Sequence, residues 1–346
     1  MGGHTCIRDS YHRKLSYLRV SVTDRCNLNC LYCRRWYFSR YFPAHEILTY
    51  EELLRLVKIG GQLGISKIRI TGGEPFVRKD VCRFIKKVVR VPGIKDVSVT
   101  TNGLLLHKYL SQLQEAGVCR LNISLDTLSR DKYKLITGRD AFDKVWHAIL
   151  AALEAGFAPV KINMVVMRGI NDEEVVQFAD LTRHYPLHVR FIEYMPSSKY
   201  RLDHNRQVMA PVIKERLSRE GGFRLYPVVP ADNSNVAELF RYKDGLGEVG
   251  FISPISKHFC HTCNRLRLTA DGQLRPCLLS DVAVPVKPSL RDGSSNIKIA
   301  SLLRKAASVK PKSGFGNSRD SSAGASGDNF GEHESDIPEL MSAIGG

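Results

Sequence analysis

Short segments rich in β-branched residues alternate with longer segments of helical periodicity over the first two thirds of the chain. The strand-like segments begin at Tyr17, Ser66, Asp96, Cys119, Val160 and Val189. Regular alternation of this kind is typical of parallel βα units. We therefore expect an α/β fold with six parallel strands, and the periodicity alone leaves open whether these form an open sheet or a partial barrel.

Two of the intervening segments carry helix-end signals. Residues 49–64 begin with Thr49 and Glu52 at the spacing of a capping box. Residues 141–156 end at Gly156, a residue typical of helix C-termini. Both segments are predicted to be amphipathic helices.

Polar residues gather directly after the predicted strands. In chain order they are a cysteine-containing loop, Gly72-Gly73-Glu74-Pro75, Thr100-Thr101-Asn102, Ser124 with Asp126, and Glu193 with Met195. Loops at the carboxyl ends of parallel strands meet on one face, where α/β proteins place their chemistry. The sequence therefore predicts one functional face.

Six of the nine cysteines form two trios. The first is Cys26, Cys30 and Cys33 (CxxxCxxC), and the second is Cys260, Cys263 and Cys277. Three thiolates on one loop suit a [4Fe–4S] cluster with one iron open to another ligand. A zinc site completed by a histidine and an electron carrier with a remote fourth cysteine are the alternatives. The other three cysteines, at positions 6, 82 and 119, are expected to be small buried or partly buried side chains.

Composition narrows the classes of protein. The 346-residue chain has a formal net charge of +16, no apolar run of membrane-spanning length and no secretory signal pattern. We expect a soluble intracellular protein whose cysteines serve metal binding or catalysis, since disulfides are rare in that environment. The charge is compatible with nucleic acid, a membrane surface or a phosphate-rich small molecule.

Changes of pattern along the chain suggest five parts. They are an N-terminal segment (1–14), the βα region (15–200), a region carrying the second trio (201–290), a flexible Gly/Ser-rich linker (291–336) and a tail ending in Gly-Gly (337–346).

The first trio stands in a distinctive context. It follows a strand, has Tyr32 just before its last cysteine, and precedes a GGEP turn. This combination resembles the radical S-adenosylmethionine superfamily. The chain also resembles the GTP 3',8-cyclase family of molybdenum cofactor biosynthesis, over residues 10–280 and the chain end. The segments that carry this resemblance are, in order, SYLRVSVTDRCN, KIRITGGEP, TTNGLLL, NISLDTL, VKINMVVMRG, RFIEYMP, FCHTCNRLRLTADGQLRPCL and the terminal IGG.

The resemblance implies a partial (β/α)6 barrel with a C-terminal extension. It implies two [4Fe–4S] clusters, one on each trio, with S-adenosylmethionine on the open iron of the first cluster and the guanine of GTP on that of the second. The implied reaction is hydrogen abstraction from C3' of GTP by a 5'-deoxyadenosyl radical, followed by C3'–C8 bond formation to 3',8-cyclo-7,8-dihydroguanosine triphosphate.

The resemblance also implies roles for individual residues. Contacts to S-adenosylmethionine fall to Tyr32, Gly73, Ser124 and Met195. Contacts to GTP fall to Arg19, Arg69, Thr100, Lys161, Arg265, Leu266 and Arg267. The terminal Gly345 and Gly346 are expected to insert into the active site and aid catalysis, because glycine can thread a crowded pocket.

Partners follow from the same resemblance. They are GTP as substrate, a second copy of the chain in a homodimer, an unidentified electron donor, and a functional link to cyclic pyranopterin monophosphate synthase, with no nucleic acid and no membrane. The expected compartment is the cytoplasm, with the mitochondrial matrix as the alternative.

Three features depart from the family pattern: the basic and aromatic run RRWYFSRYF after Cys33, Phe76 in place of a common leucine, and the linker. Two other functions remain as alternatives. One is a twin-cluster radical enzyme acting on a peptide, which would not need CNRLRLTADG or a Gly-Gly end. The other is a non-enzymatic iron–sulfur or zinc protein that binds nucleic acid, with an affinity that weakens steeply with salt.

Overall fold

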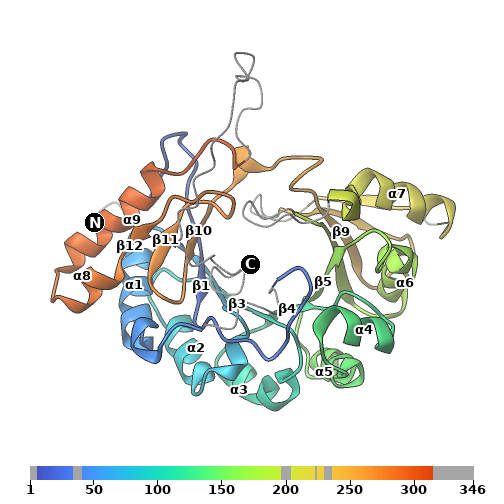
Figure 1. Cartoon of the computed structure of the whole chain (residues 1–346), viewed down its shortest axis with the longest axis horizontal. Helices are drawn as coiled ribbons and strands as arrows, with labels where there is room; N and C mark the ends of the chain where they lie inside the picture. The colour runs from blue at the N-terminus through green and yellow to red at the C-terminus, as the bar shows by residue number, and fades with distance from the viewer. Residues whose placement is uncertain (1–5, 34–40, 196–203, 223, 230–235, 315–346) are drawn as a thin grey trace, which may run out of the picture.

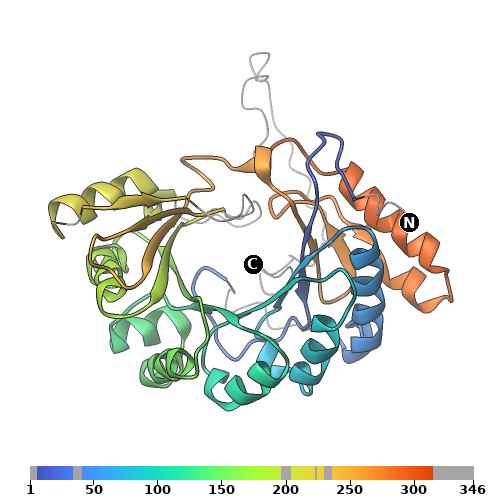
Figure 2. The same cartoon turned by 180° about the vertical axis from the view of Figure 1, so that it is seen from behind.

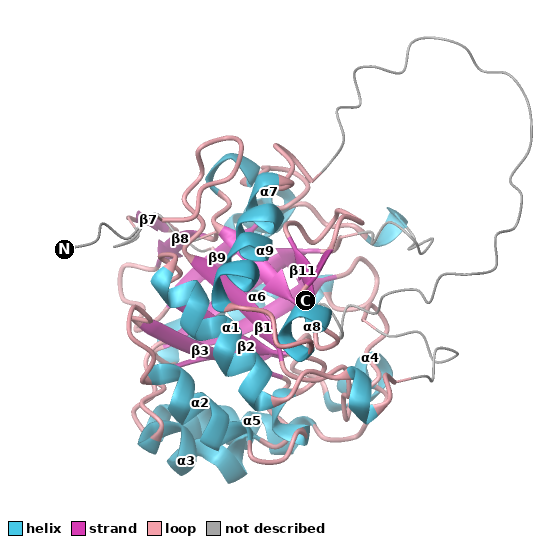
Figure 3. Ribbon diagram, turned by 90° about the vertical axis from the view of Figure 1, so that its left-hand side faces the viewer, coloured by secondary structure: helices cyan, strands magenta, loops and turns pink. Residues whose placement is uncertain are grey.

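The computed structural model describes residues 6–33, 41–195, 204–222, 224–229 and 236–314. Figure 1 shows a curved sheet that wraps around a central space, with helices along its outer side. The same arrangement seen from behind is drawn in Figure 2, and Figure 3 shows from the side how the helices cover the strands. The sheet is open on one side, so the architecture is an incomplete α/β barrel.

The six predicted strands are present and parallel. They are β1 (Tyr17–Ser21), β2 (Lys67–Thr71), β3 (Asp96–Thr101), β4 (Arg120–Ser124), β5 (Val160–Val166) and β6 (Leu187–Glu193). Each pairs in parallel with the next along the chain. This confirms the predicted α/β class and the partial barrel.

Helices connect these strands on the outer side of the sheet (Figure 1). They are α1 (Tyr50–Gln62), α2 (Val81–Val89), α3 (Leu110–Glu115), α4 (Arg130–Thr137), α5 (Phe142–Glu154) and α6 (Val175–His184). Both predicted helix-end signals are confirmed. Thr49 and Glu52 form a reciprocal capping box at the start of α1, and Gly156 follows α5 with a positive φ of 80°.

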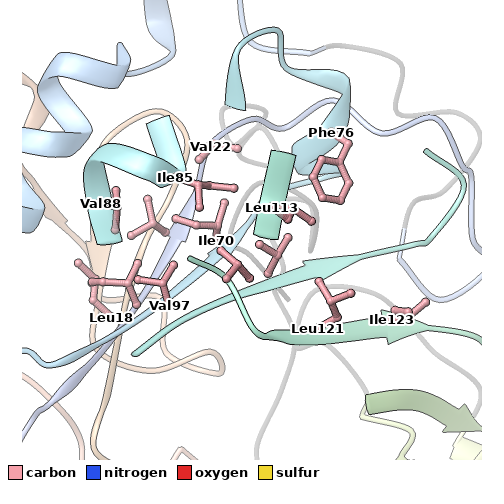
Figure 4. Packing of buried hydrophobic residues seen from close by; sticks show 14 of the residues in the cluster. Leu18, Val22, Ile70, Phe76, Ile85, Val88, Val97, Leu113, Leu121 and Ile123 are labelled. Atoms are coloured by element: carbon pink, nitrogen blue, oxygen red, sulfur yellow. The ribbon is translucent and has the colours of Figure 1, made fainter. Parts of the chain in front are cut away.

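The hydrophobic core lies between the strands and these helices. Figure 4 shows Leu18, Ile70, Val97 and Leu121 from the strands near Ile85 and Leu113 from α2 and α3. Because side chains alternate across a strand, the residues next to these apolar positions point to the inner, concave face. The polar side chains of the barrel are therefore gathered inside it.

The C-terminal part of the chain extends the same sheet at both edges. Next to β6 lie β9 (Glu248–Ile252), β8 (Glu238–Arg241) and β7 (Tyr226–Val228), and next to β1 lie β10 (Arg265–Leu268), β11 (Gln273–Arg275) and β12 (Val284–Pro285). Both β9 and β10 are parallel to their neighbours in the barrel. Helix α7 (Ala210–Arg219) packs against α6 and β6. Strands from before and after the predicted boundary at residue 200 thus share one sheet.

The predicted flexible linker is wrong in its first part. Residues beyond 291 form α9 (Asn296–Ser308), which follows the short α8 (Lys287–Arg291) and is capped by the Ser295 side chain. The physical reason is an apolar stripe of Ile299, Leu303, Ala306 and Ala307, which is buried where α9 packs on α1, β11 and β12. Residues 315–346, with the rest of the linker and the tail, lie outside the described residues.

The described residues contain no helix that is both long and apolar enough to cross a lipid bilayer.

Candidate active site

The loop that follows β1 carries the first cysteine trio and is held on two sides. Asn29 and Leu31 donate backbone hydrogen bonds of 2.9 Å to the last turn of α4. The Cys33 amide donates to the Cys30 carbonyl oxygen at 3.0 Å, which closes a tight turn. The Cys26 Sγ accepts a hydrogen bond from the Leu28 amide at 3.4 Å. The three thiols therefore lie on one fixed loop.

The GGEP turn after β2 packs directly on this cysteine loop. The Gly73 amide donates to the Thr23 carbonyl oxygen at 2.7 Å, and the Glu74 amide donates to the Arg25 carbonyl oxygen at 2.8 Å. A Cβ atom at Gly73 would lie 2.2 Å from the Arg25 carbonyl oxygen. Glycine is therefore required here by the approach of the cysteine loop itself.

Glu74 joins the GGEP turn to the end of β3. Its buried carboxylate accepts hydrogen bonds from the Phe76 amide (3.1 Å), the Thr101 hydroxyl (2.9 Å) and the Asn102 amide (2.7 Å). Burial outweighs these bonds and raises the pKa of Glu74 to about 7. The Asn102 side chain then reaches Cys26, with 3.8 Å between its Nδ2 and Sγ. The loops after β1, β2 and β3 thus form one hydrogen-bonded unit.

Tyr32 is fixed by Asp126, which follows β4. The phenol donates a hydrogen bond of 2.7 Å to one oxygen of Asp126, and the Val165 amide donates to the other at 2.9 Å. Burial raises the pKa of Asp126 to about 6 despite these bonds. Burial, followed by the neighbouring Cys33 and Asp126, also raises the pKa of the Cys30 thiol. Burial and the neighbouring acidic groups therefore act in the same direction on the Cys30 thiol.

Cationic residues lie close to the second trio. Its first two cysteines bracket the turn η6 (Cys260–Thr262), where the Cys263 amide donates to the Cys260 carbonyl oxygen at 3.2 Å. Cys277 follows β11, the neighbour of β10. Burial alone would raise the pKa of the Cys263 thiol, but the charges of Arg265 and Lys310 outweigh it and lower that pKa to about 6.

Both trios offer a donor set that suits an iron–sulfur cluster. No cysteine forms a disulfide. In a [4Fe–4S] cluster each thiolate binds its own iron at a separate corner, so three spaced thiolates are suitable ligands. Cys6 and Cys82 are at least partly buried, as predicted, whereas Cys119 is exposed, so that part of the prediction is wrong.

An in-register row of three arginines crosses the concave face. Arg267 on β10, Arg19 on β1 and Arg69 on β2 are Cα partners in neighbouring strands, about 4.8 Å apart. Arg19 and Arg267 are both buried. Burial, followed by the charges of Arg267 and Arg69, lowers the pKa of Arg19 well below its ordinary value. The row therefore concentrates positive charge in a position shielded from water.

Lys161 on β5 continues this positive region across the sheet. Burial, with Arg190 and Arg69 as the next causes, lowers its pKa to about 7. Two buried polar atoms on the same face, Arg69 Nε and Thr100 Oγ1, have no hydrogen-bond partner among the described residues. Buried polar groups are normally satisfied, so both atoms are suited to bind a polar ligand, and the Arg69 guanidinium favours an anion.

The structure places the remaining predicted residues as follows. Ser124 ends β4 and Met195 follows β6, both half-buried. Arg265 lies over the Phe259 ring, 5.1 Å from its centre. Leu266 is fully buried in the hydrophobic core, on the opposite side of β10 from the arginines, so its side chain is not brought to this face. Gly345, Gly346 and the loop 34–40 lie outside the described residues.

Two cationic residues were missed by reasoning from the sequence. Arg190 on β6 is buried beside Arg69 and Lys161, and burial lowers its pKa to about 10. Arg190 stands between apolar residues of the predicted strand, in VRFIE, and a charged residue in that setting is a signal that could have identified it. Lys310 near the second trio had no such signal, because it follows a segment whose composition predicts a linker.

Two family models match the chain. Residues 20–182 match the Radical SAM superfamily, and residues 187–315 match Molybdenum Cofactor Synthesis C. The second match includes β6 and α9, which lie outside residues 201–290, the limits predicted for the region that carries the second trio.

Curated relatives extend over most of the chain. The GTP 3',8-cyclase of Moorella thermoacetica is 45% identical over 309 residues, which are 88% of this chain and 94% of the relative. The GTP 3',8-cyclase of Heliobacterium modesticaldum is 44% identical over 342 residues, or 98% and 99% of the two chains.

A solved structure confirms the fold. The Streptococcus suis SuiB structure bound to S-adenosylmethionine superposes with a TM-score of 0.56 at 15% identity, over 78% of this chain and 62% of SuiB. The full-length relatives, with the cysteine trios and the matching C-terminal family, decide against the peptide-acting and nucleic-acid-binding alternatives. The chain belongs to the GTP 3',8-cyclase family of radical SAM enzymes, which use iron–sulfur clusters and S-adenosylmethionine in molybdenum cofactor biosynthesis.

Proposed function

We propose that the two cysteine trios and the arginine row form one active site, which converts GTP to 3',8-cyclo-7,8-dihydroguanosine triphosphate. The observation that carries the proposal is the register of β1 and β10. These strands are parallel, and the first trio follows the end of β1. Cys260 and Cys263 precede β10, and Cys277 follows the antiparallel β11, whose end lies beside the start of β10. Arg19 and Arg267 are partners midway along the two strands. A substrate on these arginines would therefore lie between the trios.

The first trio, Cys26, Cys30 and Cys33, would hold the cluster that works with S-adenosylmethionine. When bound and reduced, the cluster and S-adenosylmethionine would supply the carbon-centred radical needed for abstraction of the C3' hydrogen atom of GTP. Tyr32, Gly73, Ser124 and Met195 would position the cofactor. Tyr32 is itself held by Asp126, and Gly73 is held on the cysteine loop, so both are preorganised.

The arginines would bind the triphosphate. Arg19, Arg69 and Arg267 are buried or half-buried, and their positive charges repel one another. A bound polyanion would offset this repulsion. Lys161 and Arg265 would add charge at either side, and Thr100 a hydroxyl. The second trio, Cys260, Cys263 and Cys277, would hold the cluster that receives the guanine. Leu266 would contact GTP through its backbone alone.

The terminal Gly345 and Gly346 would complete the site. Deleting both residues should lower kcat while the iron content and GTP affinity stay unchanged. An unchanged kcat would exclude the tail from catalysis.

The broader setting is part of the same proposal. We infer a homodimer in the cytoplasm or mitochondrial matrix, an electron donor not identified by the sequence, and a product consumed by cyclic pyranopterin monophosphate synthase. Nucleic acid and membranes have no part in it.

An anaerobic assay tests the proposal. The iron-reconstituted protein is mixed with S-adenosylmethionine, dithionite and GTP deuterated at C3', and deuterium in 5'-deoxyadenosine is followed by mass spectrometry. Deuterium transfer is expected. Deoxyadenosine without deuterium would refute GTP C3' as the target, and its absence with intact clusters would refute the radical reaction.

A matched pair of variants tests the arginine row. Arg69→Met should raise the KM for GTP more than tenfold, because charged hydrogen bonds to phosphate contribute about 1.5–3 kcal/mol. Arg83→Met is the control, since Arg83 lies on α2 with its side chain 82% exposed. Equal KM values for the two variants would contradict the assignment of Arg69.

A further inference from the structure

Lys310 is a buried lysine next to the second trio. It follows α9, and only 4% of its surface is exposed. Its ammonium donates hydrogen bonds to the carbonyl oxygens of Arg265 (2.9 Å) and Pro276 (2.5 Å). Burying a lysine costs free energy unless its charge is compensated, so its position needs an explanation.

The two carbonyl groups belong to the two separate arms of the trio. Arg265 lies two residues after Cys263, and Pro276 immediately precedes Cys277. One ammonium group therefore ties the η6 arm to the β11 arm. Without it, both carbonyl oxygens would lose a charged donor, and that of Pro276 is buried.

The residues after Lys310 pack on the thiols themselves. The Ser313 hydroxyl lies 3.8 Å from the Cys260 Sγ. A Cβ atom at Gly314 would lie 2.8 Å from the Cys277 Sγ, so a glycine is needed for this approach. The segment from Lys310 to Gly314 therefore forms a wall of the second trio.

The N-terminal segment secures this wall. The Arg13 guanidinium donates to the Cys260 carbonyl oxygen at 2.5 Å and to the Pro311 carbonyl oxygen at 2.6 Å. Its charge is balanced by Asp9, with 2.5 Å between Nε and Oδ2. The charged groups that influence Lys310 are the Cys263 and Cys277 thiols and the cations Arg13 and Arg265. The anion that would balance Lys310 is thus the thiolate-ligated cluster itself.

We propose that Lys310 is a positioning residue for the cluster on the second trio, which fixes the two cysteine arms and raises the reduction potential of that cluster. This inference rests on the proposed function, which places a cluster on Cys260, Cys263 and Cys277. The potential of an iron–sulfur cluster depends on nearby charge and hydrogen bonding. A fixed positive charge beside the thiolates stabilises the reduced, more negative cluster.

The experiment isolates the second cluster in the full-length chain. Cys26→Ala, Cys30→Ala and Cys33→Ala together remove the ligands of the first site. In this background, Lys310→Met should shift the midpoint potential of the remaining cluster to more negative values, measured by redox titration with EPR detection. Lys310→Arg, which keeps the charge, should retain most of the original potential. Lys305→Met on the exposed side of α9 is the matched control and should leave the potential unchanged.

The outcomes separate the two claims. If the background protein binds no cluster at all, the proposed role of the second trio fails. If a cluster forms and its potential and iron retention are the same in Lys310→Met as in the control, the role of Lys310 is refuted. If Lys310→Met does not fold, as judged by circular dichroism, Lys310→Gln gives the same comparison, because its amide donates a hydrogen bond without the charge.

Discussion

Binding of GTP should take up a proton at Lys161, and this makes affinity depend on pH. Burial, followed by Arg190 and Arg69, lowers the Lys161 pKa to about 7 in the protein without substrate. A triphosphate placed on this face adds negative charge and raises that pKa again. The complex therefore binds more protons than the free protein, so GTP affinity falls as pH rises above 7.

The magnitude follows from the fraction of Lys161 that is charged. At pH 7 about half of the side chains are protonated, and at pH 8.5 only about 3% are. If the pKa in the complex lies well above 8.5, the affinity should fall about 15-fold between these two values, with a limiting slope of tenfold per pH unit. The change of GTP affinity with pH is thus opposite to that of a site in which binding lowers the pKa of a carboxylate, where affinity rises with pH.

The assay is equilibrium GTP binding to the reconstituted protein under anaerobic conditions at constant ionic strength. The γ-phosphate of GTP also titrates near neutral pH, so the difference between wild type and variants is the relevant quantity. Lys161→Met should bind GTP more weakly at pH 7 and lose the additional decline above it. Lys161→Arg should retain affinity and also lose the decline, because arginine stays protonated over this range.

Parallel pH curves for wild type and Lys161→Met would refute this reasoning. They would mean either that Lys161 is already charged in the free protein or that the triphosphate lies elsewhere on the concave face. The Arg69→Met variant separates these explanations, because its loss of affinity does not depend on a titrating lysine.

Three further predictions concern the scaffold. Gly73→Ala should reduce both iron content and cleavage of S-adenosylmethionine, because its Cβ would lie 2.2 Å from the Arg25 carbonyl oxygen; normal iron content would contradict this. Glu193→Gln should lower the free energy of unfolding in urea by about 2–4 kcal/mol, because the buried Glu193 carboxylate accepts hydrogen bonds from three backbone amides and a hydroxyl. Glu215→Gln on the surface is the control and should change this free energy little. Thr49→Ala should cost about 1 kcal/mol in the same measurement, through loss of the α1 cap, and an unchanged midpoint would refute the role of the cap.

The six barrel strands could be predicted because each carries a strong local signal. Segments such as Val160–Val166 consist mainly of β-branched and apolar residues, as expected for strands covered by helices. The capping box of α1 is likewise complete within four residues. Features set by neighbours along the chain were therefore accessible to sequence reasoning.

The strands contributed by the C-terminal region could not be predicted in the same way. β11 has three residues and β12 has two, and β10 carries two arginines among its four. β10 pairs with β1, more than 200 residues earlier in the chain, and β11 and β12 add to the sheet outside β10. The helix α9 was also missed, because Gly and Ser residues that follow it dominate the composition of the predicted linker, residues 291–336.

The edge pairing of β10 with β1 links the folding of the C-terminal region to the assembly of the site. Arg267 reaches the row of Arg19 and Arg69 only if β10 adds to the sheet in the observed register. A shift by one residue would move its side chain to the apolar side and bring Leu266 to the concave face. Leu266 is fully buried in the core, so this shift would expose an apolar side chain and bury a charge. The alternation of Arg265, Leu266 and Arg267 therefore fixes the register, and the same register positions the second trio at the end of the strand opposite the first.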